Sequence, residues 1–199
     1  MRFQDNTNTI LESSSNEDLT GSDFTLSSGI DVGIYECNLT DCQFVNSNIS
    51  GLVIKDSVMK NCELTNATFS EAELSKVNLN ESYGVSLDLE FAKLEKVSFA
   101  QATLIGANFA GTEAEKASFY RSDLRGADFS DSVLKEVSFV NADLRGADFT
   151  GADVSSCDFT GAIIEGADFR FANIPQSLRK QGQAKFPIIG FISLKTQGL

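Results

Sequence analysis

The chain has 199 residues, a formal net charge of −12, 42% hydrophobic residues, and no histidine or tryptophan. The absence of histidine excludes catalysis and zinc binding that depend on imidazole, and the excess of acids argues against direct binding to nucleic acid, because phosphate contacts dominate that affinity. The segment Met1–Thr9 is polar, unlike a secretory signal, and no apolar run approaches the ~18 residues of a membrane span. We therefore expect a cytoplasmic protein without a membrane span.

Residues 1–18 are rich in serine and asparagine and are expected to cap the N-terminal end of a repeat region. From Leu19 to Ile174 every fifth residue is apolar or small, which gives 32 centres, and all but Gly29, Gly84 and Ala114 carry a large apolar side chain. The residue two positions before each centre is mostly small. A period of five fits neither a helix nor a strand. Two inward positions in five instead predict a chain that turns a corner in every unit of five, and four such units close one coil.

Longer repeats support a coil of four units. The segment DLRGADF at 123–129 recurs at 143–149. When the centres are sorted into four columns, phenylalanine dominates two opposite columns toward the C-terminus and aliphatic residues fill the two between them. The two aromatic columns hold Phe99, Phe119, Phe139 and Phe159 on one side and Phe109, Phe129, Phe149 and Phe169 on the other. This alternation of large and smaller groups predicts the filling of a narrow tube.

The five-residue unit A-(D/N)-L-x-x is matched at Ala127–Phe129, Ala142–Leu144, Ala147–Phe149 and Ala167–Phe169. In this respect the chain resembles the pentapeptide-repeat family over about 155 of its residues. The resemblance implies an all-β fold, a right-handed four-sided parallel β-helix of about eight 20-residue coils over residues 19–174. With a strand spacing of ~4.8 Å the rod would be ~38 Å long.

The inward small positions include unusual residues. Leu87 is large for such a position, and we expect it to fill the volume that Gly84 leaves in the same coil. The four cysteines also lie there: Cys37, Cys42, Cys62 and Cys157. Cys42 and Cys62 lie one predicted coil apart and should stack, so a disulfide is conceivable. We interpret all four as buried thiols that serve as small core residues, as is typical of a reducing compartment.

The outward residues can be assigned to four walls. The acidic wall, which flanks the centres from Gly29 to Phe169, carries eight acids and one arginine. Its candidate interaction face is Asp31, Glu71, Asp88, Glu90, Asp128, Asp131 and Asp148. The lysine wall, which flanks the centres from Ile34 to Ile174, interleaves lysines with acids and predicts a solvated ladder of ion pairs. Its lysines are Lys55, Lys76, Lys93, Lys96, Lys116 and Lys135.

A structural interpretation of these acids stands beside the functional one. Many occupy the Asp/Asn position of the unit, where short polar side chains cap corner amides. Pairs such as Asp88 with Glu90 could bind a cation, but alternating solvated acids are commoner, and we predict no metal, cofactor or catalytic residue. The unbroken frame also leaves no inserted loops to build a cleft, so we do not expect an enzyme.

Several outward aromatic residues have no place in the repeat. An exposed aromatic among acids is a candidate anchor for a partner, because buried aromatics dominate interface energies. The candidate anchors are Phe91, Phe171, Tyr35, Tyr83 and Tyr120.

Residues 175–199 form a basic and apolar tail with four bases and no acids. Pro175 closes the last unit, and Gln176–Gln181 is expected to form a short helix. The tail has three interpretations: an intramolecular cap, a homodimer interface, or an anchor to a membrane surface. The family members that protect DNA gyrase dimerise through such a module. The candidate residues of the cap or dimer interface are Leu178, Phe186, Ile188, Ile189, Phe191 and Ile192.

Two hypotheses on function follow. The first is a non-catalytic, acidic, rod-shaped scaffold or regulator that binds one cytoplasmic protein partner. The alternative, implied by the family resemblance, is a DNA-mimicking modulator of a type II topoisomerase, DNA gyrase, which inhibits the enzyme or protects it from quinolones or toxins. Ice binding would need regular threonine ladders, and Val45 and Val85 interrupt the one that Thr25 and Thr65 begin.

Overall fold

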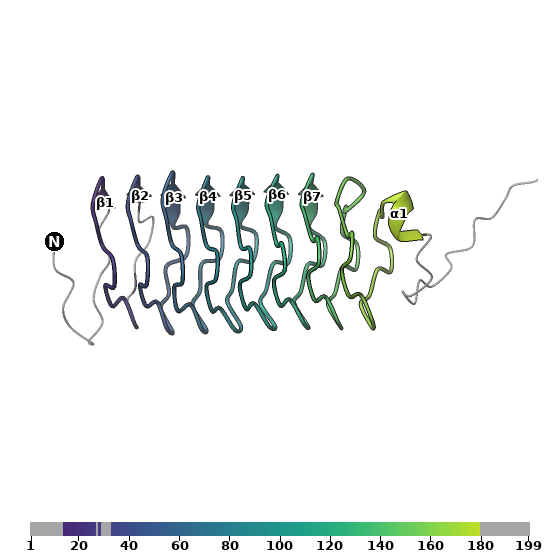
Figure 1. The fold of residues 1–199 in the computed structure, drawn as a ribbon, viewed down its shortest axis with the longest axis horizontal. Helices are drawn as coiled ribbons and strands as arrows, with labels where there is room; N and C mark the ends of the chain where they lie inside the picture. Colours follow the sequence, from purple (N-terminus) through teal and green to yellow (C-terminus); the bar gives the residue numbers. More distant parts are fainter. Residues whose placement is uncertain (1–13, 27, 29–32, 180–199) are drawn as a thin grey trace, which may run out of the picture.

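The computed structural model describes residues 14–26, 28 and 33–179. Seven short strands form one parallel sheet in sequence order, and each strand pairs only with the strands one coil before and after it (Figure 1). Every pairing joins residue i to residue i+20, as in Ile54 with Leu74. The strands are β1 (Ser14–Ser15), β2 (Gly33–Tyr35), β3 (Val53–Lys55), β4 (Glu73–Ser75), β5 (Lys93–Glu95), β6 (Glu113–Glu115) and β7 (Val133–Lys135).

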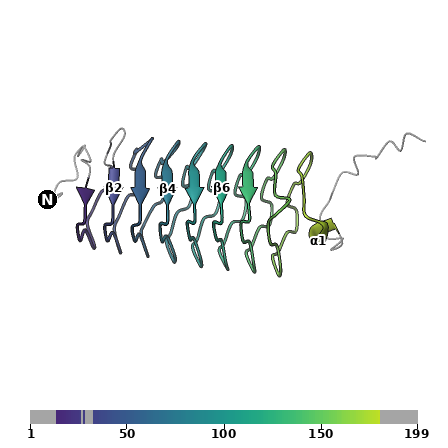
Figure 2. The ribbon, with the colours of Figure 1, turned by 90° about the horizontal axis from the view of Figure 1, so that it is seen from above.

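The sheet is the lysine wall, and the other three walls are held by isolated parallel bridges with the same register of 20. The chain is therefore a right-handed four-sided parallel β-helix, whose coils lie side by side in both views (Figure 2). The fold that the family resemblance implied is confirmed, and the register of 20 agrees with the four-unit coil predicted from the five-residue frame. The pairing begins at Ser14, upstream of the expected start at Leu19. Regular strands end at β7, so they cover fewer coils than the predicted eight, and isolated bridges continue the wall to Asn173.

The sheet ends at β7 because the next corner differs. At the corner after β6, the Lys116 amide donates to the Lys135 carbonyl oxygen at 2.9 Å. One coil later the Glu136 amide donates to Ser156 Oγ at 3.0 Å instead. A side-chain hydroxyl thus replaces a backbone acceptor, and the strand ladder stops there.

The two predicted columns of phenylalanine form the core of the C-terminal half. Rings stack within each column, as between Phe109 and Phe129, with centroids 4.7 Å apart and an interplanar angle of 3°. Rings of opposite columns meet edge to face, as between Phe119 and Phe129, at 5.6 Å and 86°. Both are favourable arrangements of aromatic pairs, so the alternation read from the sequence corresponds to interlocked stacks.

The corners combine two backbone features. The residue two positions after a centre has a left-handed backbone at most corners, for example Lys116 with φ 56° and Gly126 with φ 66°. The Asp/Asn position caps the corner, as where Asp128 Oδ1 accepts the Ser130 amide at 2.8 Å. The structural interpretation of these aspartates is therefore correct at many corners.

The four cysteines are buried and free, as predicted. Their thiols donate to backbone carbonyls: Cys42 Sγ to Leu19 O at 3.1 Å and Cys62 Sγ to Leu39 O at 3.0 Å. Burial raises the pKa of Cys42 to about 11 and that of Cys62 to about 12. These thiols are protonated hydrogen-bond donors in the folded chain.

Two further expectations on packing can be compared with the structure. A Cβ placed on Gly84 would lie 3.3 Å from Leu87 Cδ2, so Leu87 does occupy the space of the missing side chain. At the C-terminal end α1 (Gln176–Arg179) forms the described part of the helix predicted at Gln176–Gln181, and Leu178 is fully buried in the core. The remaining cap and dimer candidates, Phe186, Ile188, Ile189, Phe191 and Ile192, lie outside the described residues.

Candidate protein-interaction surface

The parallel bridges align the acidic wall. Asp88, Asn108, Asp128, Asp148 and Asp168 stand in register, one per coil. Among the predicted face residues, Glu71 and Asp131 are exposed, and the half-buried members are Asp88, Glu90, Asp128 and Asp148. Asp31 lies outside the described residues. The structure thus brings the described acids to one side of the rod.

Several of these acids cap corners and still present their charge. Asp88 Oδ1 accepts the Glu90 amide at 3.0 Å and Asn108 Nδ2 at 3.1 Å, and Asp148 Oδ1 accepts the Thr150 amide at 2.7 Å. In both residues only Oδ1 accepts these bonds, so within the described part of the chain Oδ2 is left for a partner. The capping role and a role in recognition are therefore compatible.

Asp168 is the exception on this wall. The Arg170 guanidinium bonds its carboxylate at 2.7 Å and lowers the pKa of Asp168. Within the described part of the chain, no comparable ion pair is found for the six described face residues. The row of acids without a direct ion pair therefore extends from Glu71 to Asp148, and at its end the charge of Asp148 helps to raise the pKa of the neighbouring Arg170, after the larger effect of Asp168.

Two phenylalanines project from one corner of this wall. Phe91 is 61% exposed and Phe171 is 71% exposed, and both have a left-handed backbone. The Phe91 ring lies over Gly111 of the next coil, where a Cβ would collide with it. The Asp131 carboxylate lies over Gly151 in the same way. We name this line of residues the Phe91–Phe171 ridge: Phe91, Gly111, Asp131, Gly151 and Phe171.

The three tyrosines do not belong to this surface. Tyr35 lies on the lysine wall, in β2, and Tyr83 lies on a third wall; both are exposed. Tyr120 is half-buried, and the Arg121 guanidinium lies over its ring at 5.1 Å from the centroid. The expectation that Tyr120 is an exposed anchor is therefore corrected, because a neighbouring cation already covers its ring.

Four of the six lysines predicted to form a ladder on the lysine wall make ion pairs in the described part of the chain: Lys76, Lys93, Lys96 and Lys116. Lys93 pairs with Glu73 at 3.3 Å, Lys96 with Glu95 at 2.7 Å, and Lys76 with Asp56 at 3.0 Å. The bond to Asp56 raises the pKa of Lys76. All these side chains are exposed, so each pair contributes little to stability.

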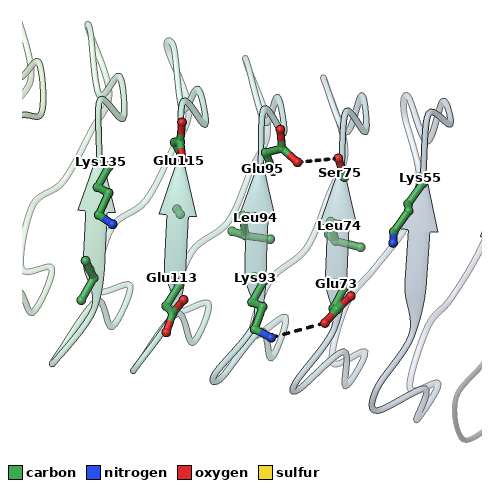
Figure 3. Close-up of a pocket in the computed structure, with 12 residues that line it drawn as sticks. Lys55, Glu73, Leu74, Ser75, Lys93, Leu94, Glu95, Glu113, Glu115 and Lys135 are labelled. Atoms are coloured by element: carbon green, nitrogen blue, oxygen red, sulfur yellow. Dashed lines mark hydrogen bonds and ion pairs between the residues drawn. The ribbon is translucent and has the colours of Figure 1, made fainter.

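Sequence reasoning missed a groove on this wall. It has a volume of about 560 Å³ and crosses β3 to β7 over Leu74, Leu94 and Ala114. Figure 3 shows its two rims, with Glu73, Lys93 and Glu113 on one side and Ser75, Glu95 and Glu115 on the other. The groove arises because side chains at alternate positions on each strand stand in parallel rows. Its charges nearly cancel, so no ligand class is favoured.

Among residues 14–26, 28 and 33–179 no cluster of three or more acids or cysteines has the arrangement of a metal site. In the same residues no helix has the length and apolar character needed to cross a membrane.

The pentapeptide repeat region family model matches residues 54–129 and 92–169, and the chain belongs to this family. A comparison with curated protein sequences finds no match. The solved structures that are similar include QnrB1, a plasmid-mediated fluoroquinolone resistance protein, with a TM-score of 0.76 and 16% identity over 85% of this chain and 84% of that one.

Two other solved structures are similar to this chain with lower TM-scores. HetL, from the cyanobacterium Nostoc sp. strain PCC 7120, has 19% identity over 84% of this chain and 90% of its own, with a TM-score of 0.35. A pentapeptide repeat protein of the Arabidopsis thaliana thylakoid lumen has 32% identity over 48% of this chain and 70% of its own, with a TM-score of 0.31. The likeness to QnrB1 shows the fold.

Proposed function

We propose that this chain is a non-catalytic rod that binds a cytoplasmic protein partner through its acidic wall and the Phe91–Phe171 ridge. The observation that carries the proposal is the exposed ring of Phe91, which lies over Gly111 beside unpaired acids. The fold gains little from this ring, because the same corner position is glycine at 51, 111 and 151. A phenylalanine in a left-handed backbone also costs about 1–2 kcal/mol.

The chemistry of the wall indicates the kind of partner. Exposed aromatics that become buried are frequent hot spots of interfaces, and the surrounding carboxylates favour a basic surface. Phe91 and Phe171 are four coils apart, which corresponds to ~19 Å at the strand spacing. The partner would therefore offer two apolar recesses on a basic face.

Site-specific photocrosslinking tests this proposal. A photoreactive phenylalanine analogue at Phe91 should capture one protein in a lysate of the source cells, whereas the same analogue at Tyr83, exposed on another wall, should not. The captured protein, once purified, should bind Phe91→Ala at least about 30-fold more weakly than the unmodified chain. Equal capture from both positions, or unchanged binding of Phe91→Ala, would contradict the proposal.

A second candidate function is a DNA-mimicking modulator of DNA gyrase. The row of unpaired carboxylates and the fold shared with the fluoroquinolone resistance protein QnrB1 favour it. Duplex DNA carries one charge per ~1.7 Å of its axis. The acidic wall, with a net charge of −7 in the sequence, carries one per ~5 Å over a rod of ~38 Å. The acidic wall would therefore imitate the sign of the charge on DNA at about one third of its charge density along the axis.

Gyrase supercoiling, measured with and without a quinolone across a titration of the chain, tests this candidate. Inhibition or protection should fade as salt is added. The variant Asp128→Asn/Asp131→Asn/Asp148→Asn keeps an oxygen for each cap and removes three charges, and it should lose the effect. Glu113→Gln/Glu115→Gln/Glu136→Gln on the lysine wall also removes three charges; it is the matched control and should retain the effect. An effect that survives the first variant would rule out the mimicry.

We also propose that the chain forms a homodimer through its C-terminal tail. The proposal is supported by the apolar and acid-free composition of residues 175–199. Light scattering should give the mass of a dimer for the full chain and the mass of a monomer for a chain that ends at Arg179. The same oligomeric state for both chains would exclude a tail-mediated dimer.

A further inference from the structure

We propose that Cys37, Cys42 and Cys62 form a modification site for small disulfides, such as glutathione disulfide, and that this site becomes accessible when the N-terminal coils separate from the rest of the rod. This inference is independent of the acidic wall and of any protein partner. It rests on where the thiols lie, on how the two halves are packed, and on the size of the position that the thiols occupy.

The three thiols lie together near one end. Cys37 and Cys42 occupy successive corners of one coil, and Cys62 lies one coil beyond Cys42, where the bridge between Gln43 and Glu63 holds the two segments in register. All three side chains are at most 3% exposed. Each thiol is therefore protected only while its coil remains stacked on its neighbours.

The two halves of the rod are packed differently. Eight phenylalanines from Phe99 to Phe169 form the interlocked stacks of the C-terminal half. The coils around the three thiols contain only Phe24, Phe44 and Phe69, and the centres that follow as far as Leu94 are leucine or, at Gly84, glycine. Aromatic pairs contribute to stability beyond the area they bury. The N-terminal coils lack most of that contribution.

A polar defect lies in the same region. The Ser47 hydroxyl is buried without a hydrogen-bond partner, in the coil that holds Cys37 and Cys42. Ser82 and Thr112, which have equivalent positions, donate to the carbonyls of Met59 and Leu89. Thr150 also has a hydroxyl without a partner, but this residue is half-buried and lies on a wall. A buried hydroxyl without a partner lowers stability, because it loses its hydrogen bonds to water and gains none in the fold.

The linear architecture allows one end to open alone. In a solenoid each repeat contacts only its neighbours, so stability is a sum over interfaces and the weakest interfaces open first. Cys157, the fourth thiol, lies two positions before Phe159, which stacks on Phe139 and meets Phe149 and Phe169 edge to face. Cys42 lies two positions before Phe44, which among the described rings stacks on Phe24 and meets Phe69 alone edge to face. We expect Cys157 to stay protected while the three N-terminal thiols are exposed.

The reaction is thiol–disulfide exchange. In the open state a thiol loses its proton to solvent, and the thiolate attacks one sulfur of the small disulfide. A protein–reagent S–S bond forms, the reagent's own S–S bond breaks, and its second half leaves as a thiolate with the electron pair. The adduct is too large for a position that elsewhere holds alanine or serine, and Cys42 Sγ already contacts the Leu19 carbonyl at 3.1 Å. Modified coils therefore cannot close.

The test follows the release of nitrothiobenzoate from dithiobis(nitrobenzoate) by the full-length chain at about pH 8, without denaturant. Cys157→Ala should release three equivalents in one phase. Cys37→Ala/Cys42→Ala/Cys62→Ala should react at least about ten-fold more slowly. Equal rates for the two variants would overturn the proposal, as would a chain in which no thiol reacts until global unfolding.

A matched pair of variants links the rate to the N-terminal packing. Ser47→Ala removes the unpaired hydroxyl and should slow the reaction of the three thiols at least about five-fold. Thr150→Val removes the other unpaired hydroxyl and should leave that rate unchanged. Circular dichroism of the triply modified Cys157→Ala chain should show partial loss of β-structure. A complete loss, or none, would show that the modification does not hold the N-terminal coils open.

Discussion

The small inward position, two residues before each centre, shows how one hydroxyl or thiol group changes the local hydrogen bonding. Alanine fills it without a polar group, whereas serine, threonine and cysteine each need an acceptor. Ser82 and Cys62 find one in a carbonyl of the preceding coil, and Ser47 does not. The position therefore tolerates several residue types, and each choice changes the balance between packing and hydrogen bonding.

Replacement of one stacked phenylalanine tests how much a single core residue contributes to stability. Phe129 is fully buried and contacts rings in three directions, above, below and across the tube. We expect Phe129→Ala to lower the free energy of unfolding by about 3–5 kcal/mol. Phe91→Ala, which removes an exposed ring, should change it by less than about 0.5 kcal/mol. Urea unfolding of the two variants measures both values, and a loss below about 1 kcal/mol at Phe129 would contradict its interior role.

The corner aspartates predict a dependence of stability on pH. The bonds to Thr160, first from its hydroxyl and then from its amide, lower the pKa of Asp158 in the folded chain. Its contribution is therefore complete above the pKa of the unfolded chain, about 3.9, and is lost as the pH falls through the lower folded pKa. Similar lowering at Asp143, Asp153 and Asp168 acts in the same direction.

Asp158→Asn isolates one of these groups, because the amide keeps an oxygen for the cap and does not titrate. The variant should match the parent at neutral pH within about 0.5 kcal/mol. It should lose less stability than the parent between about pH 4 and pH 2. Chemical unfolding at a series of pH values measures this, and parallel curves for the two chains would show that Asp158 contributes nothing through its ionisation.

At the scale of the element, the corner is the unit that repeats. Lys116 illustrates the conformational cost of the corner, since its φ of 56° is unfavourable for residues other than glycine and, to a lesser degree, asparagine and aspartate. Lys116→Gly and Lys116→Val both remove the exposed ion pair with Glu115, so their difference reports on the backbone alone. We expect the glycine variant to be more stable than the valine variant by about 1–2 kcal/mol in thermal or urea unfolding. Equal stability would mean that the corner relaxes to another conformation.

The elements also show what sequence reasoning can and cannot predict. The inward residues follow from hydrophobic periodicity, so Leu94 and Phe109 could be placed in the core from the pattern alone. The left-handed corners could not be predicted at Lys116 or Phe91, because residues of all kinds occupy them once the neighbouring coils hold the backbone. The change at Ser156 was also missed, because it depends on one hydroxyl replacing a carbonyl and leaves the frame of five intact.

The candidate site, like the fold, could be predicted from the sequence only in part. The acidic wall followed from the frame, because the register of 20 determines which residues share a side. The position of the Phe91 ring over Gly111 depends on side-chain direction, and the groove over Ala114 depends on the spacing of two side-chain rows. Neither feature is encoded in a local pattern of residues.

At the scale of the whole molecule, the constant register predicts which deletions the rod accepts. Deletion of residues 124–143 joins Asp123 to Leu144 and restores the segment DLRGADF. The shortened chain should fold with one coil fewer, unfold cooperatively, and lose some stability, because the sum over interfaces is shorter. Deletion of residues 124–141 falls short of a full coil and shifts all later centres, so it should abolish the β-structure of the C-terminal half. Circular dichroism and size-exclusion chromatography distinguish these outcomes, and equal behaviour of the two deletions would contradict the register.

The constant register has a consequence for how the chain folds during synthesis. Paired residues are separated by one coil at every level, so the relative contact order is about 0.1, the value typical of helical bundles rather than of β-proteins. Each coil can pair with the coil before it as soon as the ribosome has released it, and no segment pairs with a distant part of the sequence. The N-terminal coils, which have few aromatic centres, emerge first, and each aromatic coil that follows is added to a rod that already exists.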